Sequence, residues 1–361
     1  MRRDMPVQEF SVDYIVGPTT LGVYGIKRYQ DEIHGRMPSA RLNRIEYIAS
    51  KNRLAAIAKK LFFPLSVLFS LKKGNVKHIT TQYLAYLCFL PGMGNSIVTV
   101  YDTVFIERKN DFPFFTRILI SADIAGIRRA GAVITISDYS AAQIEKLLGV
   151  PKEKIFVVKP GMDLKFFTRR AHEPEKWGAK GKPVILSLGS EDPRQNVDKV
   201  MKAVALLKNE YPSIRMLKAG NPQWKGGRES LVSLSEKLGI SERVLFLGYV
   251  PEEKLPSLYS SADVFVYPCS STGWGLPPAE AMACGTPTVA SRVPPLPEVV
   301  GDGAFLVNPE SEEEIAAAIR RLLEESKLRA KLAKNAKAHL SKFSWGKAAK
   351  ETENVYRKVL E

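Results

Sequence analysis

Short runs of apolar and β-branched residues alternate with amphipathic stretches along the first part of the chain. The apolar runs fall at 12–17, 78–81, 96–102, 132–137 and 155–158. The stretch 26–37 has the mixed pattern of a surface helix. Strands that alternate with helices form parallel sheets covered on both faces. The pattern therefore predicts a doubly wound α/β domain over residues 1–165.

The same alternation starts again after a polar segment, 166–182, whose Pro, Gly and Lys content is typical of a linker. Apolar runs recur at 183–189, 214–220, 243–250, 263–269, 286–291 and 304–309. We therefore expect a second doubly wound domain over 183–344. The tail, about 345–361, is expected to form an amphipathic helix. Because parallel sheets bind ligands at the carboxyl ends of their strands, two such domains predict a ligand cleft between them.

Composition supports two globular domains, since the chain has 361 residues and is 45% hydrophobic. Its three cysteines, Cys88, Cys269 and Cys284, lack metal-ligand spacing and are expected to be buried, reduced thiols. The start of the sequence lacks the apolar stretch of a signal peptide. No apolar window reaches the roughly 18 residues that span a bilayer. We therefore expect a cytoplasmic protein, soluble or peripheral at the inner face of the cell membrane.

The formal net charge is +15, and residues 1–165 carry 24 basic and 14 acidic side chains. A field of this sign attracts phosphates, nucleic acid or anionic lipid. The first domain lacks the basic–aromatic interleaving of single-strand binders, and no helix-turn-helix or zinc module is evident. Nucleic acid is therefore the least favoured of the three partners.

The segment 263–291 carries the strongest chemical signal. A buried strand leads into a loop with Gly273 and Gly275, whose backbone can approach a ligand closely. The next helix begins near Pro277 and ends before Gly285. Its free N–H groups predict an anion site suited to phosphates. Glu280, placed here in the first helical turn, is either a ligand-binding residue or a charge that favours the helix dipole.

This segment resembles the donor-binding motif of family 4 retaining glycosyltransferases of the GT-B fold. That motif has a Glu, then Gly-Phe-Gly-Leu-Pro, then a second Glu. The resemblance implies that Glu280 binds the ribose of a nucleotide-sugar donor. It also implies that main-chain amides hold the sugar and phosphate, at Gly273, Trp274, Gly275 and Leu276.

Other segments resemble the family in the same order along nearly the whole chain. The segment 186–196 is similar to a phosphate-side motif and implies roles for Gly189 and Arg194. The segment 247–268 is similar to the nucleobase side, with Tyr249, Val250 and Leu255 as walls. The loop with Gly22 and Gly25 resembles the family's first glycine loop, near donor phosphate and acceptor, although an ordinary tight turn explains it too. Lys27 and Arg28, which follow, are a solvated basic face or acceptor ligands. The last helix resembles one that returns to the first domain in the family.

Three positions depart from the family pattern, and each loses a charge or a titratable group. Thr272 replaces the first Glu of the motif, Gln195 replaces a Lys that neutralises the diphosphate, and Tyr101 replaces a His beside Asp102. Arg194 lies next to Gln195 and is expected to compensate for the missing charge. Asp102 is either a catalytic neighbour or the cap of a turn, and Arg194 is either a diphosphate ligand or a solvated loop residue.

The resemblance implies a hexosyltransferase of mannosyl or glucosyl type that retains anomeric configuration. In this front-face mechanism, the departing diphosphate takes the acceptor proton, so little protein acid–base chemistry is needed. The candidate catalytic residues are Arg194, Asp102, Tyr101 and Thr272. No cofactor and no metal are expected. The alternative is a sugar-nucleotide-binding protein on the same fold, catalytically impaired by the three departures.

A basic and apolar segment at 36–77 has ten basic residues and one acidic residue, Glu46. Its apolar run has Lys pairs on both sides and is too short to cross a bilayer. It is either a core helix with Lys at its ends or a helix that docks on an anionic membrane. Docking would suit a polyprenol- or other lipid-linked acceptor.

Overall fold

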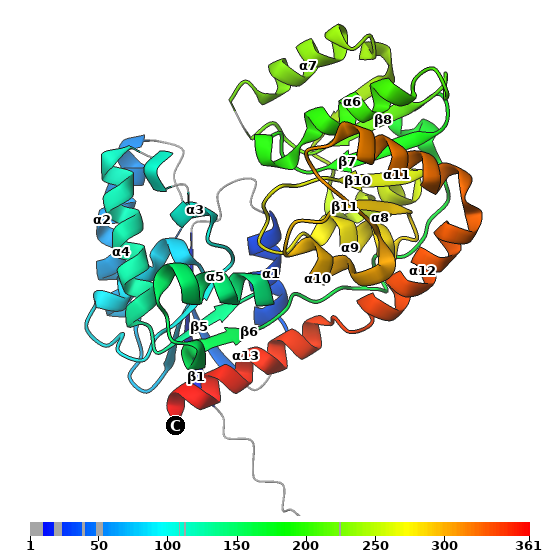
Figure 1. Cartoon of the computed structure of the whole chain (residues 1–361). Helices are drawn as coiled ribbons and strands as arrows, with labels where there is room; N and C mark the ends of the chain where they lie inside the picture. The colour runs from blue at the N-terminus through cyan, green and yellow to red at the C-terminus, as the bar shows by residue number, and fades with distance from the viewer. Residues whose placement is uncertain are drawn as a thin grey trace, which may run out of the picture. The chain divides into compact units, whose positions relative to one another are not determined.

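The computed structural model describes residues 10–17, 24–37, 40–47, 53–107, 109–111, 113–223 and 225–361. The chain divides into two compact units. The first comprises Met1–Gly161 and Trp345–Glu361, and the second comprises Met162–Ser344. Each unit contains one six-stranded parallel sheet with helices packed around it (Figure 1). The predicted pair of doubly wound α/β domains is therefore confirmed.

The sheet of the first unit has the strand order β2-β1-β3-β4-β5-β6. Its strands are β1 (Phe10–Val16), β2 (Ala40–Glu46), β3 (Val76–Ile79), β4 (Ile97–Val100), β5 (Ala132–Thr135) and β6 (Ile155–Val157). Its helices are α1 (Tyr24–His34), α2 (Arg53–Ser70), α3 (Val104–Glu107), α4 (Phe114–Arg129), α5 (Asp138–Leu148) and α13 (Trp345–Leu360).

The sequence pattern did not predict β2. This strand lies at the edge of the sheet and pairs with β1 alone. Its polar residues, among them Asn43 and the exposed Arg44, interrupt the apolar run that marks the other strands. An edge strand has only one neighbour and is more exposed, so it needs no continuous apolar run.

A buried histidine links the last helix to the first sheet. In His78 of β3, Nδ1 lies 2.7 Å from the Tyr356 hydroxyl and Nε2 lies 2.8 Å from Oγ1 of Thr99. Tyr356 comes from α13 and is fully buried. Burial lowers the pKa of His78 to about 3, so the ring is neutral near pH 7. The residues of α13 therefore complete the core of the first unit.

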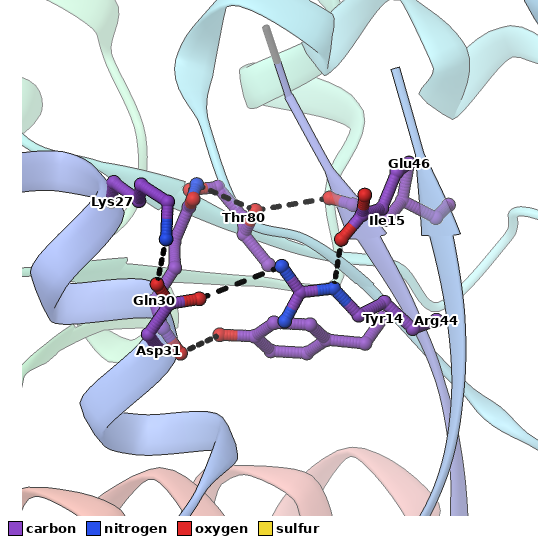
Figure 2. A network of polar contacts seen from close by, with 8 residues as sticks. All are labelled: Tyr14, Ile15, Lys27, Gln30, Asp31, Arg44, Glu46 and Thr80. Carbon is purple, nitrogen blue, oxygen red and sulfur yellow. Dashed lines mark hydrogen bonds and ion pairs between the residues drawn. The ribbon is translucent and has the colours of Figure 1, made fainter. Parts of the chain in front are cut away.

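Helix α1 is fixed to the sheet by a chain of polar contacts (Figure 2). The Tyr14 hydroxyl donates to the carbonyl of Gln30 at 3.2 Å. The amide of Gln30 donates to Oγ1 of Thr80 at 2.9 Å, and that hydroxyl donates to the carbonyl of Ile15 at 3.0 Å. All four residues are buried, so this network satisfies polar groups that would otherwise be costly in the core.

The sheet of the second unit has the order β12-β11-β10-β7-β8-β9. Its strands are β7 (Val184–Leu188), β8 (Arg215–Ala219), β9 (Val244–Gly248), β10 (Val264–Tyr267), β11 (Thr288–Ser291) and β12 (Phe305–Val307). Its helices are α6 (Val197–Leu207), α7 (Gly227–Lys237), α8 (Leu255–Ser260), α9 (Leu276–Ala283), α10 (Leu296–Val300), α11 (Glu312–Glu324) and α12 (Ser326–Leu340). Helices α6 and α11 pack together in one apolar core cluster on this sheet.

Candidate functional site

Two candidate segments meet at the carboxyl ends of neighbouring strands in the second unit. Strands β7 and β10 pair directly, so the residues that follow them emerge side by side. The backbone N–H of Ser270 donates to the carbonyl of Arg194 at 2.8 Å. The side-chain amide of Asn196 donates to the carbonyl of Pro268 at 3.1 Å. The phosphate-side segment and the glycine-rich segment therefore lie side by side at the carboxyl end of the sheet. We call this edge of the candidate site the rim.

The glycine-rich loop turns sharply at Gly275. Its φ is +96°, and an added Cβ would lie 2.6 Å from Cδ2 of Leu296, so only glycine fits here. Helix α9 starts at the next residue, Leu276, with no side-chain cap on its first N–H groups. Gly273 and Leu276 are partly exposed. This arrangement leaves main-chain donors at a helix start that suits an anion.

The Trp274 side chain anchors this loop. It is only 5% exposed, and its ring meets that of Phe343 edge to face, with 5.5 Å between centroids. The ring is therefore part of the packing of the second unit. Its predicted role through the main-chain amide stays a prediction.

Glu280 is held by a buried tyrosine. Its carboxylate is 4% exposed, and Oε2 accepts a hydrogen bond of 2.8 Å from the Tyr259 hydroxyl. Burial and then the nearby Glu280 raise the pKa of Tyr259 well above its usual value, so the hydroxyl stays a donor. Because α9 begins at Leu276, Glu280 is beyond the first turn. The alternative based on a first-turn helix dipole is therefore wrong.

Two of the departures from the family pattern meet at one hydroxyl. Gln195 and Thr272 both lie close to the hydroxyl of Tyr267, the last residue of β10, and each lowers its pKa. The Gln195 amide also lies 3.5 Å from Sγ of Cys269. Burial chiefly raises the pKa of Tyr267, so this hydroxyl remains neutral. An uncharged cluster therefore occupies the positions where the family pattern has a carboxylate and an ammonium group.

Arg194 forms a two-point ion pair with Asp192. Its Nε lies 2.9 Å from Oδ1 of Asp192, and its Nη2 lies 3.1 Å from Oδ2. The Arg194 side chain is 36% exposed. The guanidinium thus lies on the rim with a carboxylate beside it. Its predicted contact with the diphosphate stays a prediction.

A buried charged cluster behind the rim was not predicted. The Lys218 ammonium is fully buried and donates to the carbonyls of Gly189 and Ala219 at 2.8 and 2.7 Å. Burial lowers its pKa to about 8. Nearby, Nε of Arg228 donates to the buried Glu191 at 2.9 Å. The signal in the sequence was a lysine inside the apolar run of β8, which is unusual for a central strand.

Lys218 therefore fixes the turn at Gly189, a predicted donor-binding residue. Gly189 has a φ of +152°, and its carbonyl also lies where a side chain on Gly220 would be. The predicted nucleobase walls follow β9 at the edge of the sheet. Tyr249 is 48% exposed and Val250 is 9% exposed. Leu255 begins α8 and is partly buried.

The candidate catalytic residues of the first unit, Tyr101 and Asp102, make structural contacts within that unit. Tyr101 is 4% exposed, and its hydroxyl donates to the carbonyl of Thr80 at 3.0 Å. Burial raises its pKa well above the usual value. Asp102 accepts a 3.2 Å hydrogen bond from the N–H of Val104 at the start of α3. This contact fits the alternative in which Asp102 caps a turn. Tyr101 is therefore part of the core, and its hydroxyl is already used there.

The first glycine loop is described only in part. Gly22 lies outside the described residues, and Gly25 is exposed in the first turn of α1. Lys27 pairs with Asp31 along the same helix, and its side chain is 57% exposed (Figure 2). This pairing favours the interpretation of Lys27 as part of a solvated face.

Among the described residues, no group of three or more His, Cys, Asp or Glu side chains is placed to hold a metal ion. All three cysteines are free and buried, as expected. Within the described part of the chain, no helix is both long and apolar enough to cross a membrane.

Comparison with known families and structures shows which proteins this chain resembles. Residues 169–339 match the family "Glycosyl transferases group 1". The whole chain is similar to Anabaena HepE crystallised with UDP and glucose. The TM-score is 0.79 at 18% identity, over 96% of this chain and 100% of that one. This likeness shows the fold, which is the predicted GT-B fold.

Relatives with assigned functions cover the chain only in part. One is O-antigen chain mannosyltransferase B of Escherichia coli, 33% identical over 236 residues, or 63% of this chain and 61% of that protein. Another is a D-inositol 3-phosphate glycosyltransferase of Corynebacterium urealyticum, 34% identical over 246 residues, or 64% and 58%. The matched region spans about three fifths of the length of these relatives.

Proposed function

We propose that the protein is a retaining glycosyltransferase that moves a hexosyl group from a nucleotide-diphosphate sugar to an acceptor hydroxyl. The observation that carries the proposal is the buried Glu280 beyond the glycine-rich turn, with Tyr259 holding one of its oxygens. The other oxygen is proposed to accept from a ribose hydroxyl. The N–H groups of Leu276 and Ala279 at the start of α9, where Pro277 and Pro278 carry none, are proposed to hold the diphosphate.

The comparisons support this proposal. The matched family contains glycosyl transferases, one relative is named as a mannosyltransferase, and HepE was crystallised with UDP and glucose. In the proposed step, the acceptor oxygen forms a bond to the anomeric carbon while the bond from that carbon to the diphosphate breaks. The acceptor proton passes to the departing phosphate. This step needs no protein base and no metal, which we propose as properties of the enzyme.

The test uses a panel of nucleotide sugars that includes UDP-glucose and GDP-mannose. Incubation of the full chain with each donor is expected to release the nucleotide slowly, and faster with a suitable acceptor. NMR of the product reports the anomeric configuration, and excess EDTA tests the need for metal. The proposal is overturned if the protein binds none of these nucleotide sugars.

A second candidate function is nucleotide-sugar binding without transfer. It is favoured by the uncharged Gln195 and Thr272 at Tyr267 and by the burial of Tyr101. Electrostatic stabilisation at a reacting centre is commonly worth about 3 kcal/mol per group, so these losses matter. Tight donor binding without turnover, across all acceptors, would decide for this candidate.

We also propose that the acceptor is lipid-linked. The protein would reach it by docking on the anionic inner face of the cell membrane. Helix α2 has a buried side with Phe63 and Val67, which fits the alternative of core packing. Its other side exposes Phe62 and Phe69 at 65% and 90%, with Leu65 between them at 48%. Exposed apolar side chains beside Lys72 and Lys73 suit an anionic bilayer.

Vesicle sedimentation tests this part of the proposal. Changing both Phe62 and Phe69 to Ser should reduce binding to vesicles of phosphatidylglycerol. Leu206→Ser, which alters an exposed leucine on α6 in the second unit, is the matched control. Equal binding by the wild type and the double variant, both folded, would exclude α2 as the docking surface.

A further inference from the structure

A cavity lies in the second unit, at the amino ends of β10, β11 and β12. Its volume is about 300 Å³, within the range of small-molecule sites. The lining includes Asp263, Pro287 and Gly303, each of which closely precedes one of these strands. The glycine-rich loop follows β10 at its carboxyl end, so the two places are at opposite ends of the sheet. The nucleotide-sugar proposal does not use this cavity.

Two arginines give the cavity a cationic wall. Arg169 is exposed, and within the described chain its guanidinium has no hydrogen-bond or ion-pair partner. Arg329 of α12 donates through Nη1 to the carbonyls of Leu322 and Leu323, each at 2.9 Å. These bonds fix the Arg329 side chain and leave its other nitrogens for a ligand. Paired guanidinium groups favour phosphate because their fork geometry matches its oxygens.

The cavity is also lined by His172 and by Asp263, whose Oδ2 accepts a hydrogen bond of 2.8 Å from the N–H of Val184. His172 has Nδ1 at 3.1 Å from the carbonyl of Ser260, so this nitrogen carries the proton. Nε2 of the same ring is buried without a hydrogen-bond partner and lies 3.8 Å from Oδ1 of Asp263. While the ring is neutral, both of these atoms are acceptors. A ligand hydroxyl would donate its hydrogen to one of them.

Most of the remaining lining is apolar, with the hydroxyl residues Ser260 and Thr286 as exceptions. It includes Met282 at the end of α9 and Leu332, Ala333 and Ala336 of α12. These side chains suit the carbon skeleton of a ligand, and the alanines leave room for it. From these three features we infer that the cavity binds a phosphorylated polyol or sugar. The phosphate lies on Arg169 and Arg329, and a hydroxyl faces His172 and Asp263.

Titration calorimetry on the full chain tests the inference, with glucose 6-phosphate as the probe and glucose and inorganic phosphate as partial probes. Glucose 6-phosphate is expected to bind with one-to-one stoichiometry and more tightly than either partial probe. Arg169→Gln should weaken that binding about tenfold or more, since it removes a charged hydrogen-bond donor. Ala333→Phe should abolish it by filling the cavity.

Two matched variants separate this site from general charge or helix effects. Arg321→Gln removes an exposed arginine of α11 outside the cavity, and Ala338→Phe places the same bulk on α12 away from it. Both should bind like the wild type. The inference is overturned if glucose 6-phosphate does not bind at millimolar concentration. It is also overturned if Arg169→Gln and Ala333→Phe leave binding unchanged, because the ligand then lies elsewhere. If inorganic phosphate binds as tightly as glucose 6-phosphate, the cavity recognises phosphate alone, and the inference of a polyol or sugar is overturned.

Discussion

The hydroxyl of Tyr259 donates to the carboxylate of Glu280 at 2.8 Å, and both side chains are buried. The two residues come from different helices, α8 and α9, so the contact joins them at the candidate donor site. A buried carboxylate keeps its charge only when donors satisfy it. The tyrosine therefore sets the orientation in which Glu280 can accept a further hydroxyl.

Glu280→Gln should weaken nucleotide binding by about ten- to a hundredfold. A hydrogen bond to a charged group is worth about 1.5–3 kcal/mol, and an amide offers only one oxygen to the two donors. Calorimetry with the free nucleoside diphosphate measures the change. Tyr259→Phe should have a smaller effect, because the carboxylate remains. Unchanged affinity in folded Glu280→Gln protein would contradict the ribose role.

Gln195→Lys should strengthen binding of a nucleoside diphosphate several-fold. The new ammonium would lie near the rim between Arg194 and the Tyr267 hydroxyl, where the family pattern has a cation. Leu206→Lys adds the same charge on the exposed face of α6 and should have little effect at physiological salt. If both variants gain equally, the effect is long-range attraction and the local role of position 195 is wrong.

Stability should fall with acidity because of His78. The unfolded ring takes up a proton as the pH falls below about 6.5, whereas the folded ring stays neutral until about pH 3. The stabilisation is therefore complete above pH 6.5 and is lost toward pH 3, by up to about 1.4 kcal/mol per pH unit. Urea unfolding of the wild type and His78→Gln between pH 7 and 4 measures it. A variant with the same pH slope as the wild type would rule out this origin.

Lys218 should make the stability of the protein depend on pH at the alkaline end of the scale. Above pH 8 the folded lysine releases its proton, while the unfolded one keeps it to about 10.5. The unfolded state then binds more protons, so this group makes stability rise between pH 8 and 10.5. Lys218→Met should remove that rise, and the exposed Lys237→Met should retain it. The difference between the two variants in chemical unfolding is the relevant readout, since buried tyrosines titrate as well.

The sequence was sufficient for both sheets because buried parallel strands are nearly continuous apolar runs. It did not reveal β2, whose edge position allows polar residues. In the candidate site, Gly275 and Glu280 were named through the resemblance of their segment to a family motif, and their roles stay predictions. Tyr259 and Lys218 were missed, because their partners lie far away in the chain and only folding brings them together. The cleft between the two units stays a prediction.

Helix α9 has only eight residues, which corresponds to about 12 Å of length at 1.5 Å per residue. Its first residue follows the glycine-rich turn, and Met282 near its last residue lines the cavity at the amino ends of β10, β11 and β12. Thr286, also on that cavity wall, donates to the carbonyl of Tyr259 at 2.7 Å. So short a rod does not bend easily. An occupant that pushes on its far end would tilt the carboxylate of Glu280, so binding in the cavity would be coupled through α9 to the proposed donor site.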